Sequence, residues 1–370
     1  MNILRRLPLS RLLLLCGLVV AVGASATALA SALGSAPTPP PARLAVAVHD
    51  ALAAPQVEGF RANIKLTNRL VEGVNLASGG NGEAGQLSSS PLLSGATGRV
   101  WIAKDGRLRL ELQAEKGDTE IYYDGHTVSL FDASTNTVYR YVVPRQEGSP
   151  QGETPGGHEE VPSVAKIEEA ITKLSKHAHV TGAIPGDVAG QPTYTVRVSP
   201  REGGSLLGGA ELSWDADNGV PLRAAVYSST SSSPVIELAA TDEVSFGPVE
   251  ASVFEFKPPA GATVKDVKLG EHDASSTGTH PTEGSSHPTV TEHGHGIGGV
   301  VVLEDTRGRT SGKQLDGLPE GLPKVKLGGA TATELPTALG TLLTFERSGV
   351  HYVVGGFVAP STVEGVARGL

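Results

Sequence analysis

The clearest pattern along the chain is a strict alternation of leucine with charged residues at positions 107–112, which read Arg-Leu-Arg-Leu-Glu-Leu. Successive side chains of a β-strand point to opposite faces, so this period of two predicts a strand with one face in a core and the other in water. Similar segments, separated by turn residues, lie at 99–103, 120–123, 127–131, 137–143, 193–199, 210–214, 221–228, 235–240 and 243–246. We therefore predict about ten antiparallel strands.

Two segments repeat apolar residues at helical spacing instead. From Val164, the residues Ile167, Ile171 and Leu174 fall on one stripe, which predicts a helix that packs on the sheet. Residues 43–53 predict a second helix for the same reason. Many strands with few helices indicate an α+β fold, in which one strongly curved antiparallel sheet carries its helices on one side.

Compositional shifts divide the chain. Residues 35–41, 78–98, 147–157 and 269–299 are rich in Gly, Ser, Pro, Thr or His, and such segments bury too little apolar area to fold alone. The last of them predicts a linker between a large domain at 42–268 and a small C-terminal α+β module at 300–370. In that module, residues 341–346 and 350–358 predict a hairpin, and a capping-box spacing from Ser361 to Glu364 predicts a final helix.

The N-terminus has the layout of an export signal. Arg5, Arg6 and Arg11 precede an apolar run at 12–33, and small residues near its end suit cleavage, which makes residues 1–36 a signal peptide. The run is also about 20 residues long, enough to span a bilayer if it is not cut. The protein is thus expected in the periplasm, or held at the outer face of the cytoplasmic membrane by residues 12–33.

Composition excludes several classes of function. The only cysteine, Cys16, lies in the export segment, so the remaining chain has no disulfide and no thiolate chemistry. The net charge is −9 and no basic cluster follows the export segment, which argues against a nucleic-acid partner. No Gly-x-Ser-x-Gly elbow is present, and we expect neither an enzyme nor a cofactor.

Histidine is concentrated in the predicted linker. Its five residues there are His272, His280, His287, His293 and His295. Imidazole is a common metal ligand, and the spacing of His293 and His295 would let both bind one ion. Because carboxylate partners and regular ligand spacing are missing, a solvated polar linker is favoured and no metal site is expected.

Three groups of residues, in a fixed order, resemble a known superfamily. They are residues 57–62 behind the first helix, residues 98–101 and 107–111 followed by Tyr123-Asp124-Gly125, and residues 214–223 followed by 253–261. Over residues 42–268 the chain resembles the LolA/LppX-like superfamily of extracytoplasmic lipoprotein and lipid carriers. The resemblance implies an incomplete β-barrel with helices on its concave side.

The resemblance also implies a function without catalysis, in which a lipid or an acylated lipoprotein lies in an apolar half-barrel cavity before transfer to a receiving lipoprotein. Alternating positions on strands of the matched region give the candidate contacts Trp101, Leu108, Leu110, Leu112, Ile121 and Tyr123. Alternation fixes which residues share a face, but leaves open which face forms the cavity and whether these residues are ordinary core.

Two departures from simple carriers point to an alternative. The chain has a Gly/Ser-rich insertion at 78–98 and about 70 further residues after the carrier-like part. RseB-like sigma-factor regulators resemble this layout, and residues 344–352 resemble their C-terminal piece. The alternative function is therefore a regulator that senses lipidated or envelope cargo and binds a membrane-bound anti-sigma factor.

Overall fold

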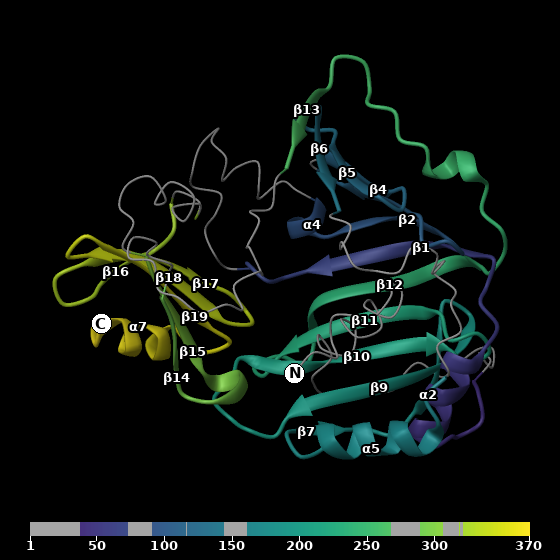
Figure 1. Ribbon diagram of the computed structural model, residues 1–370, viewed down its shortest axis with the longest axis horizontal. Helices are drawn as coiled ribbons and strands as arrows, with labels where there is room; N and C mark the ends of the chain where they lie inside the picture. The colour runs from purple at the N-terminus through teal and green to yellow at the C-terminus, as the bar shows by residue number, and fades with distance from the viewer. Residues whose placement is uncertain are drawn as a thin grey trace, which may run out of the picture. The chain divides into compact units, whose positions relative to one another are not determined.

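The computed structural model describes residues 38–72, 91–115, 117–143, 161–267, 289–305, 318 and 321–370. They form two compact units (Figure 1). The first unit comprises the described parts of Met1–Arg69, Ser89–Arg201 and Gly208–Asp266, and the second comprises those of Leu70–Ser88, Glu202–Leu207 and Val267–Leu370.

A thirteen-stranded sheet forms the first unit, in the order β13-β6-β5-β4-β3-β2-β1-β12-β11-β10-β9-β7, with β8 paired to β9. The strands are β1 (Gly59–Asn68), β2 (Ala96–Ala103), β3 (Leu108–Ala114), β4 (Gly117–Tyr123), β5 (Thr127–Asp132), β6 (Thr137–Val142), β7 (Ala178–Val180), β8 (Ile184–Val188), β9 (Gln191–Pro200), β10 (Leu207–Asp215), β11 (Pro221–Ser228), β12 (Pro234–Ser245) and β13 (Thr263–Asp266).

The sheet differs from the prediction in two respects. It is mixed rather than antiparallel, because β13 runs parallel to β6. It also has more strands than predicted, because β1, β7, β8 and β13 are not among the alternating segments. The last three are only three to five residues long and show little alternation. The predicted segments 235–240 and 243–246 form one strand, β12, which continues through Glu243 at a positive φ of 50°. No closed or curled sheet is recognised among the described residues, so the incomplete barrel stays a prediction.

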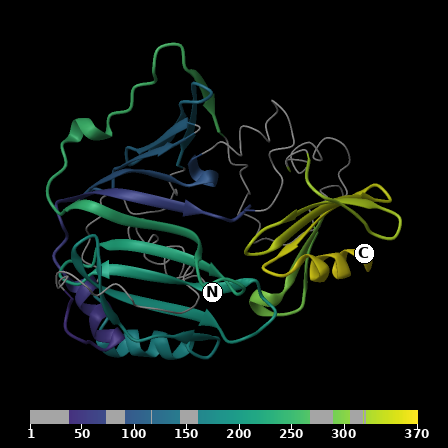
Figure 2. The same ribbon diagram turned by 180° about the vertical axis from the view of Figure 1, so that it is seen from behind.

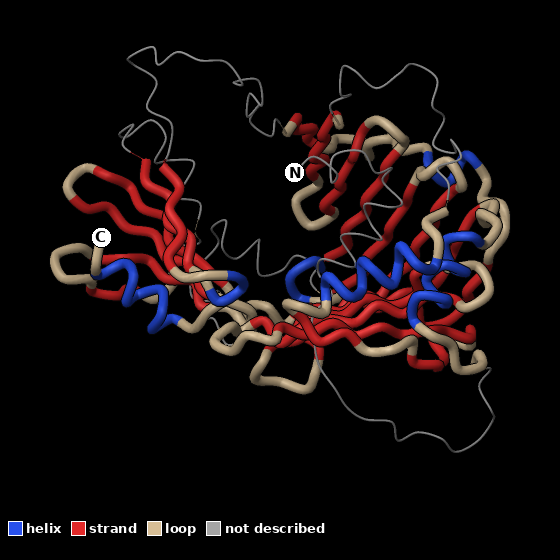
Figure 3. The backbone as a smooth tube through the Cα atoms, turned by 60° about the horizontal axis from the view of Figure 1, so that its bottom comes forward, coloured by secondary structure: helices blue, strands red, loops and turns tan. Residues whose placement is uncertain are grey.

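Both predicted helices are present, as α2 (Leu44–Ala53) and α5 (Val164–Leu174), and they lie side by side (Figure 2). The Ser163 hydroxyl accepts a hydrogen bond from the Lys166 amide at the start of α5, as an N-cap does. Ala47 of α2 and Leu174 of α5 pack with Val196 of β9 and Trp214 of β10 in one core. Figure 3 shows the helices in blue against the strands in red.

Two shorter helical segments complete the first unit. The helix α4 (Pro91–Ser94) packs on β1, β3 and β4. The 3-10 helix η2 (Ala251–Phe254) follows β12 and contacts β3. Both therefore lie against the strands that carry the predicted site residues.

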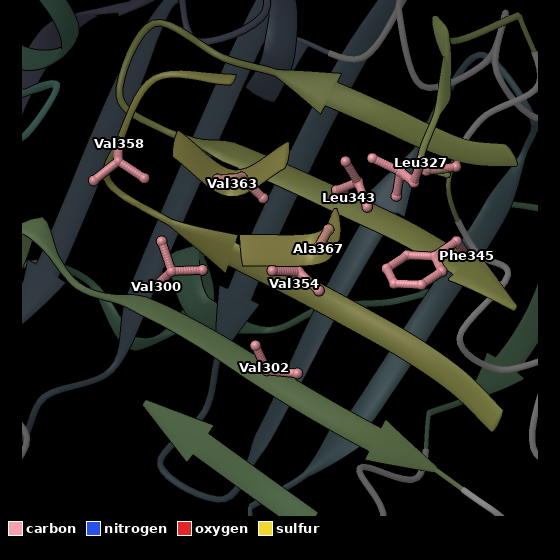
Figure 4. Close-up of a cluster of buried hydrophobic side chains, with 10 residues drawn as sticks. Val300, Val302, Leu327, Leu343, Phe345, Val354, Val358, Val363 and Ala367 are labelled. Carbon is pink, nitrogen blue, oxygen red and sulfur yellow. The ribbon is translucent and has the colours of Figure 1, made fainter. Parts of the chain in front are cut away.

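The second unit has its own six-stranded sheet, in the order β14-β15-β19-β18-β17-β16. Its elements are β14 (Thr289–His293), the 3-10 helix η3 (Gly296–Gly298), β15 (Val300–Asp305), β16 (Lys324–Lys326), β17 (Thr331–Pro336), β18 (Thr341–Arg347), β19 (Val350–Gly356) and α7 (Pro360–Arg368). Figure 4 shows the core of this unit, in which Val363 and Ala367 of α7 cluster with Leu343 and Val354 of the sheet. The last part of the predicted linker, residues 289–298, contains β14 and η3, and β14 pairs with β15.

Candidate functional site

Two rows of apolar and aromatic side chains cross strands β2 to β6 on one face of the large sheet. Residues directly opposite one another on paired strands point to the same face. By the strand registers, the first row is Ile102, Leu108, Tyr123, Val128 and Tyr141, and the second row is Val100, Leu110, Ile121, Leu130 and Tyr139. All ten side chains are only partly buried. We call this side of the sheet the apolar face and its other side the polar face.

The structure brings five of the six predicted site residues onto the apolar face. Leu108, Leu110, Ile121 and Tyr123 lie in the two rows. Leu112 lies on the same face but is only 1% exposed and belongs to the core, together with Phe60, Ile64 and Leu222. A ligand contact at these positions stays a prediction. Four of them are only partly buried, and one of these, Leu110, also packs against the same core.

Trp101 lies on the polar face, because it pairs with Arg109 rather than with a leucine. Its ring is flanked by the guanidinium groups of Arg99 and Arg109, at 5.3 and 5.4 Å from the ring centroid. Such cation–π contacts stabilise the pairing of β2 with β3. The alternation in residues 99–103 is less regular than in 107–112. It therefore does not show that Trp101 lies on the face opposite to the leucines.

The apolar face is more buried towards β1 and more exposed towards β6. At β1, Phe60 and Ala62 lie opposite Ile102 and Val100 and are 6% and 4% exposed. Leu92 of α4 packs against the core on this side. The tyrosines at β6 are partly exposed. The rows therefore run from the core of the first unit at β1 to partly exposed tyrosines at β6.

A further apolar side chain extends this face to β12. Leu238 is 41% exposed and lies opposite Leu66 of β1 and Ala224 of β11. Large apolar side chains in mid-sheet are usually covered, and an exposed one beside others indicates a surface for an apolar partner.

The polar face carries ion pairs that the sequence did not reveal. Arg109 Nη2 lies 2.5 Å from Glu111 Oε1 and 3.6 Å from Glu120 Oε2. Tyr122 is 6% exposed and donates a hydrogen bond to Glu120. Burial, together with that hydrogen bond, raises the pKa of Tyr122 far above its usual value, so the phenol stays protonated.

A second cluster on the polar face is centred on Glu211 of β10. Its carboxylate accepts hydrogen bonds from Arg197, Arg223 and Tyr227, each at 2.7 Å. Burial alone would raise the pKa of Glu211, but these bonds and the charge of Arg223 hold it below its usual value. These residues lie on three neighbouring strands, with the hydrogen-bonded pairs 4 to 16 positions apart. In the sequence, each is visible only as a charged or polar position within a strand.

The polar face is also covered by the chain that follows β12. The rings of Phe256 and Tyr122 lie 4.8 Å apart, and the Arg107 guanidinium lies 5.0 Å from the Phe254 ring. Arg109 also donates a hydrogen bond to the carbonyl of Val253. The polar face near β3 and β4 is thus closed by residues 253–256, which leaves the apolar face as the candidate binding surface.

The structure offers no metal centre among the residues it describes, where no group of three or more His, Cys, Asp or Glu side chains converges. His293 and His295 are exposed, at β14 and beside η3. The other three linker histidines, His272, His280 and His287, lie outside the described residues, as do residues 1–36. Within the described ranges, no helix has the length and apolar character needed to cross a bilayer.

One known protein family matches the part of the chain that forms the strands of the two rows. A family model described as "Predicted periplasmic protein (DUF2092)" matches residues 82–148, a range that contains β2 to β6 and both rows. This description confirms the predicted location outside the cytoplasm, whereas anchoring by residues 12–33 stays a prediction. No curated protein matches the chain.

Solved structures of low sequence identity also resemble the chain. The MucA/MucB complex of Pseudomonas aeruginosa contains a chain that is 16% identical, with 88% of this chain and 96% of that chain covered and a TM-score of 0.40. An uncharacterised conserved protein from Thermus thermophilus is 11% identical over 60% of this chain and 98% of its own, with a TM-score of 0.34.

A LolA superfamily protein from Nitrosomonas europaea is 8% identical over 85% of this chain and 90% of its own, with a TM-score of 0.19. Likenesses at this level do not assign a function. The chain is similar to proteins of the MucB and LolA kinds.

Proposed function

We propose that the chain is an extracytoplasmic regulatory binding protein of the RseB-like kind. It holds an acyl chain of a lipid or lipoprotein on the apolar face of the first unit, and it binds a membrane-bound protein, such as the outer domain of an anti-sigma factor. The observation that carries this proposal is that the unit with the partly exposed apolar rows is joined to a second unit with its own core. A protein that only carries lipid has no need of the second unit.

The size of the apolar face supports an acyl ligand. Five strands at about 4.8 Å spacing make each row about 19 Å long, about the length of an extended acyl chain of sixteen carbons. Each buried methylene contributes about 0.8 kcal/mol, so about ten of them contribute about 8 kcal/mol before the entropic cost of association is subtracted. The net affinity is then moderate, and binding is reversible.

The second candidate function is a simple carrier that delivers an acylated lipoprotein or a lipid to a receiving lipoprotein. The two rows favour it as well, since a half-open barrel with helices on its concave side would present such a surface. The two functions differ in the protein partner. The regulatory protein forms a stable complex with a membrane-bound regulator, whereas the carrier binds its lipoprotein only transiently.

In vivo crosslinking of the exported chain, followed by identification of the captured proteins, separates these functions. The regulatory function predicts one membrane protein with an extracytoplasmic domain, recovered in amounts that change when lipid is added. Recovery of lipoproteins alone supports the carrier, and capture of neither class contradicts both. Ile121→Gln on the apolar face should weaken lipid binding, whereas Thr97→Gln, an exposed position on the polar face, is the matched control.

A further inference from the structure

The two rows end differently at the two edges of the apolar face. At β1 they run into the core, where Phe60 and Ala62 are 6% and 4% exposed. At β6 they end in Tyr141 and Tyr139, both partly exposed. Strand β13 lies next to β6 at the edge of the sheet (Figure 1). The register of the two strands puts Lys265 directly beside Tyr139, at the outer end of the second row.

Lys265 presents a positive charge at that end. Its Nζ lies 5.5 Å from the centroid of the Tyr139 ring, so the ammonium group rests over an aromatic face at the edge of the sheet. The side chain is exposed, and no ion pair of Lys265 with another described residue is found. The neighbouring charged residues Arg140 and Asp266 are one position away on their strands, and therefore on the polar face.

Two carboxylates of this part of the sheet, Asp132 on the apolar face and Asp124 in the turn before β5, accept hydrogen bonds from other groups. Asp132 accepts hydrogen bonds from the Ser134 amide and hydroxyl and from the Thr135 hydroxyl. Asp124, in the turn between β4 and β5, accepts from the backbone amides of His126 and Thr127. Neither carboxylate forms an ion pair with the ammonium group of Lys265.

We infer that the ligand of the apolar face is a membrane lipid with an anionic phosphate head group, bound with its acyl chain along the rows and its phosphate at Lys265. This inference rests on the proposed function and adds the class of ligand and its direction. The opposite direction would bury the phosphate beside Phe60 and Ala62, and an unpaired charge in an apolar core is strongly disfavoured. With the phosphate at β13, the charge stays in water and the tail enters the buried end.

The test compares two fluorescent lysolipids that share one acyl chain, lysophosphatidic acid with an anionic phosphate head and the corresponding monoacylglycerol, which is neutral because it has no phosphate. They are titrated into the exported protein, into Lys265→Met and into Lys65→Met. Methionine keeps the apolar stem of the lysine but removes its charge. Lys65 is an exposed lysine on the polar face and serves as the matched control.

The wild-type protein is expected to bind the anionic lysolipid about fivefold more tightly, as for one exposed charge pair. Lys265→Met should remove this preference and leave the affinity for the neutral lysolipid unchanged, while Lys65→Met behaves as wild type. High salt should reduce the preference, and inorganic phosphate alone should not displace the lipid.

Equal binding of both lysolipids by the wild type, or a preference that survives in Lys265→Met, overturns the inference but leaves the proposed function standing. Displacement by inorganic phosphate at equal concentration also overturns it, because the tail would then contribute nothing. Failure of both lysolipids to bind overturns the inference and the acyl-binding function together.

Discussion

The turn between β10 and β11 offers a sharp test of how the first unit is held together. Gly219 has a φ of +73°, in the left-handed region, and a Cβ added there would overlap the carbonyl oxygen of Ala51 in α2. Gly219→Ala therefore has two costs. The left-handed backbone costs about 1–2 kcal/mol for a residue with a Cβ, and overpacking against a rigid backbone costs about 1–3 kcal/mol more.

Urea unfolding followed by tryptophan fluorescence measures this loss selectively, because both tryptophans, Trp101 and Trp214, belong to the first unit. We expect Gly219→Ala to lower the free energy of unfolding by about 2–5 kcal/mol. Gly190→Ala is the matched control, since Gly190 has a φ of +80° but nothing within 4 Å of the added Cβ. It should lose only about 1 kcal/mol. Equal losses in the two variants would refute a tight contact between this turn and α2.

Three further predictions concern stability. Glu211→Gln should cost about 3 kcal/mol at neutral pH, because it leaves buried Arg197 without a carboxylate and leaves Arg223 with Glu237 alone. The folded-state pKa of Glu211 is lowered, so its contribution to the free energy of unfolding is complete above the unfolded pKa near 4.5 and is lost as the pH falls through the folded value. A difference in urea midpoint between wild type and Glu211→Gln that stays constant down to pH 3 would contradict this. Leu112→Ala should cost about 2–5 kcal/mol by tryptophan fluorescence, and a loss below 1 kcal/mol would argue against its place in the core. Leu343→Ala should raise amide hydrogen exchange in β15, β18 and β19, and unchanged exchange would contradict the core of Figure 4.

The strongest periodic patterns predicted the fold well. The leucine strand at 107–112 corresponds to β3, with Leu110 and Leu112 on one face and Arg109 and Glu111 on the other. The apolar stripe from Val164 corresponds to α5. Both patterns are local, because burial of one side of a strand or helix requires apolar residues at a regular spacing in the sequence.

Features set by pairing between distant segments could not be predicted in this way. The parallel strand β13 contains four exposed residues and is held by its pairing with β6, so its own pattern carries no signal. The face of Trp101 depends on its register with β3, which puts it opposite Arg109. An Asp-Gly pair favours a two-residue turn with two positive φ values, but in Asp124-Gly125 only Gly125 has one, at 96°, and His126 completes a longer turn.

Native mass spectrometry of the exported protein, purified without detergent from cells that contain membranes, tests the central claim most directly. The apolar face predicts a bound lipid on the wild-type chain, retained in Thr97→Gln and depleted in Ile121→Gln, because Ile121 lies in the middle of the second row. Wild-type protein that carries no lipid, or lipid that is retained equally in both variants, would contradict the claim that this face is the binding site.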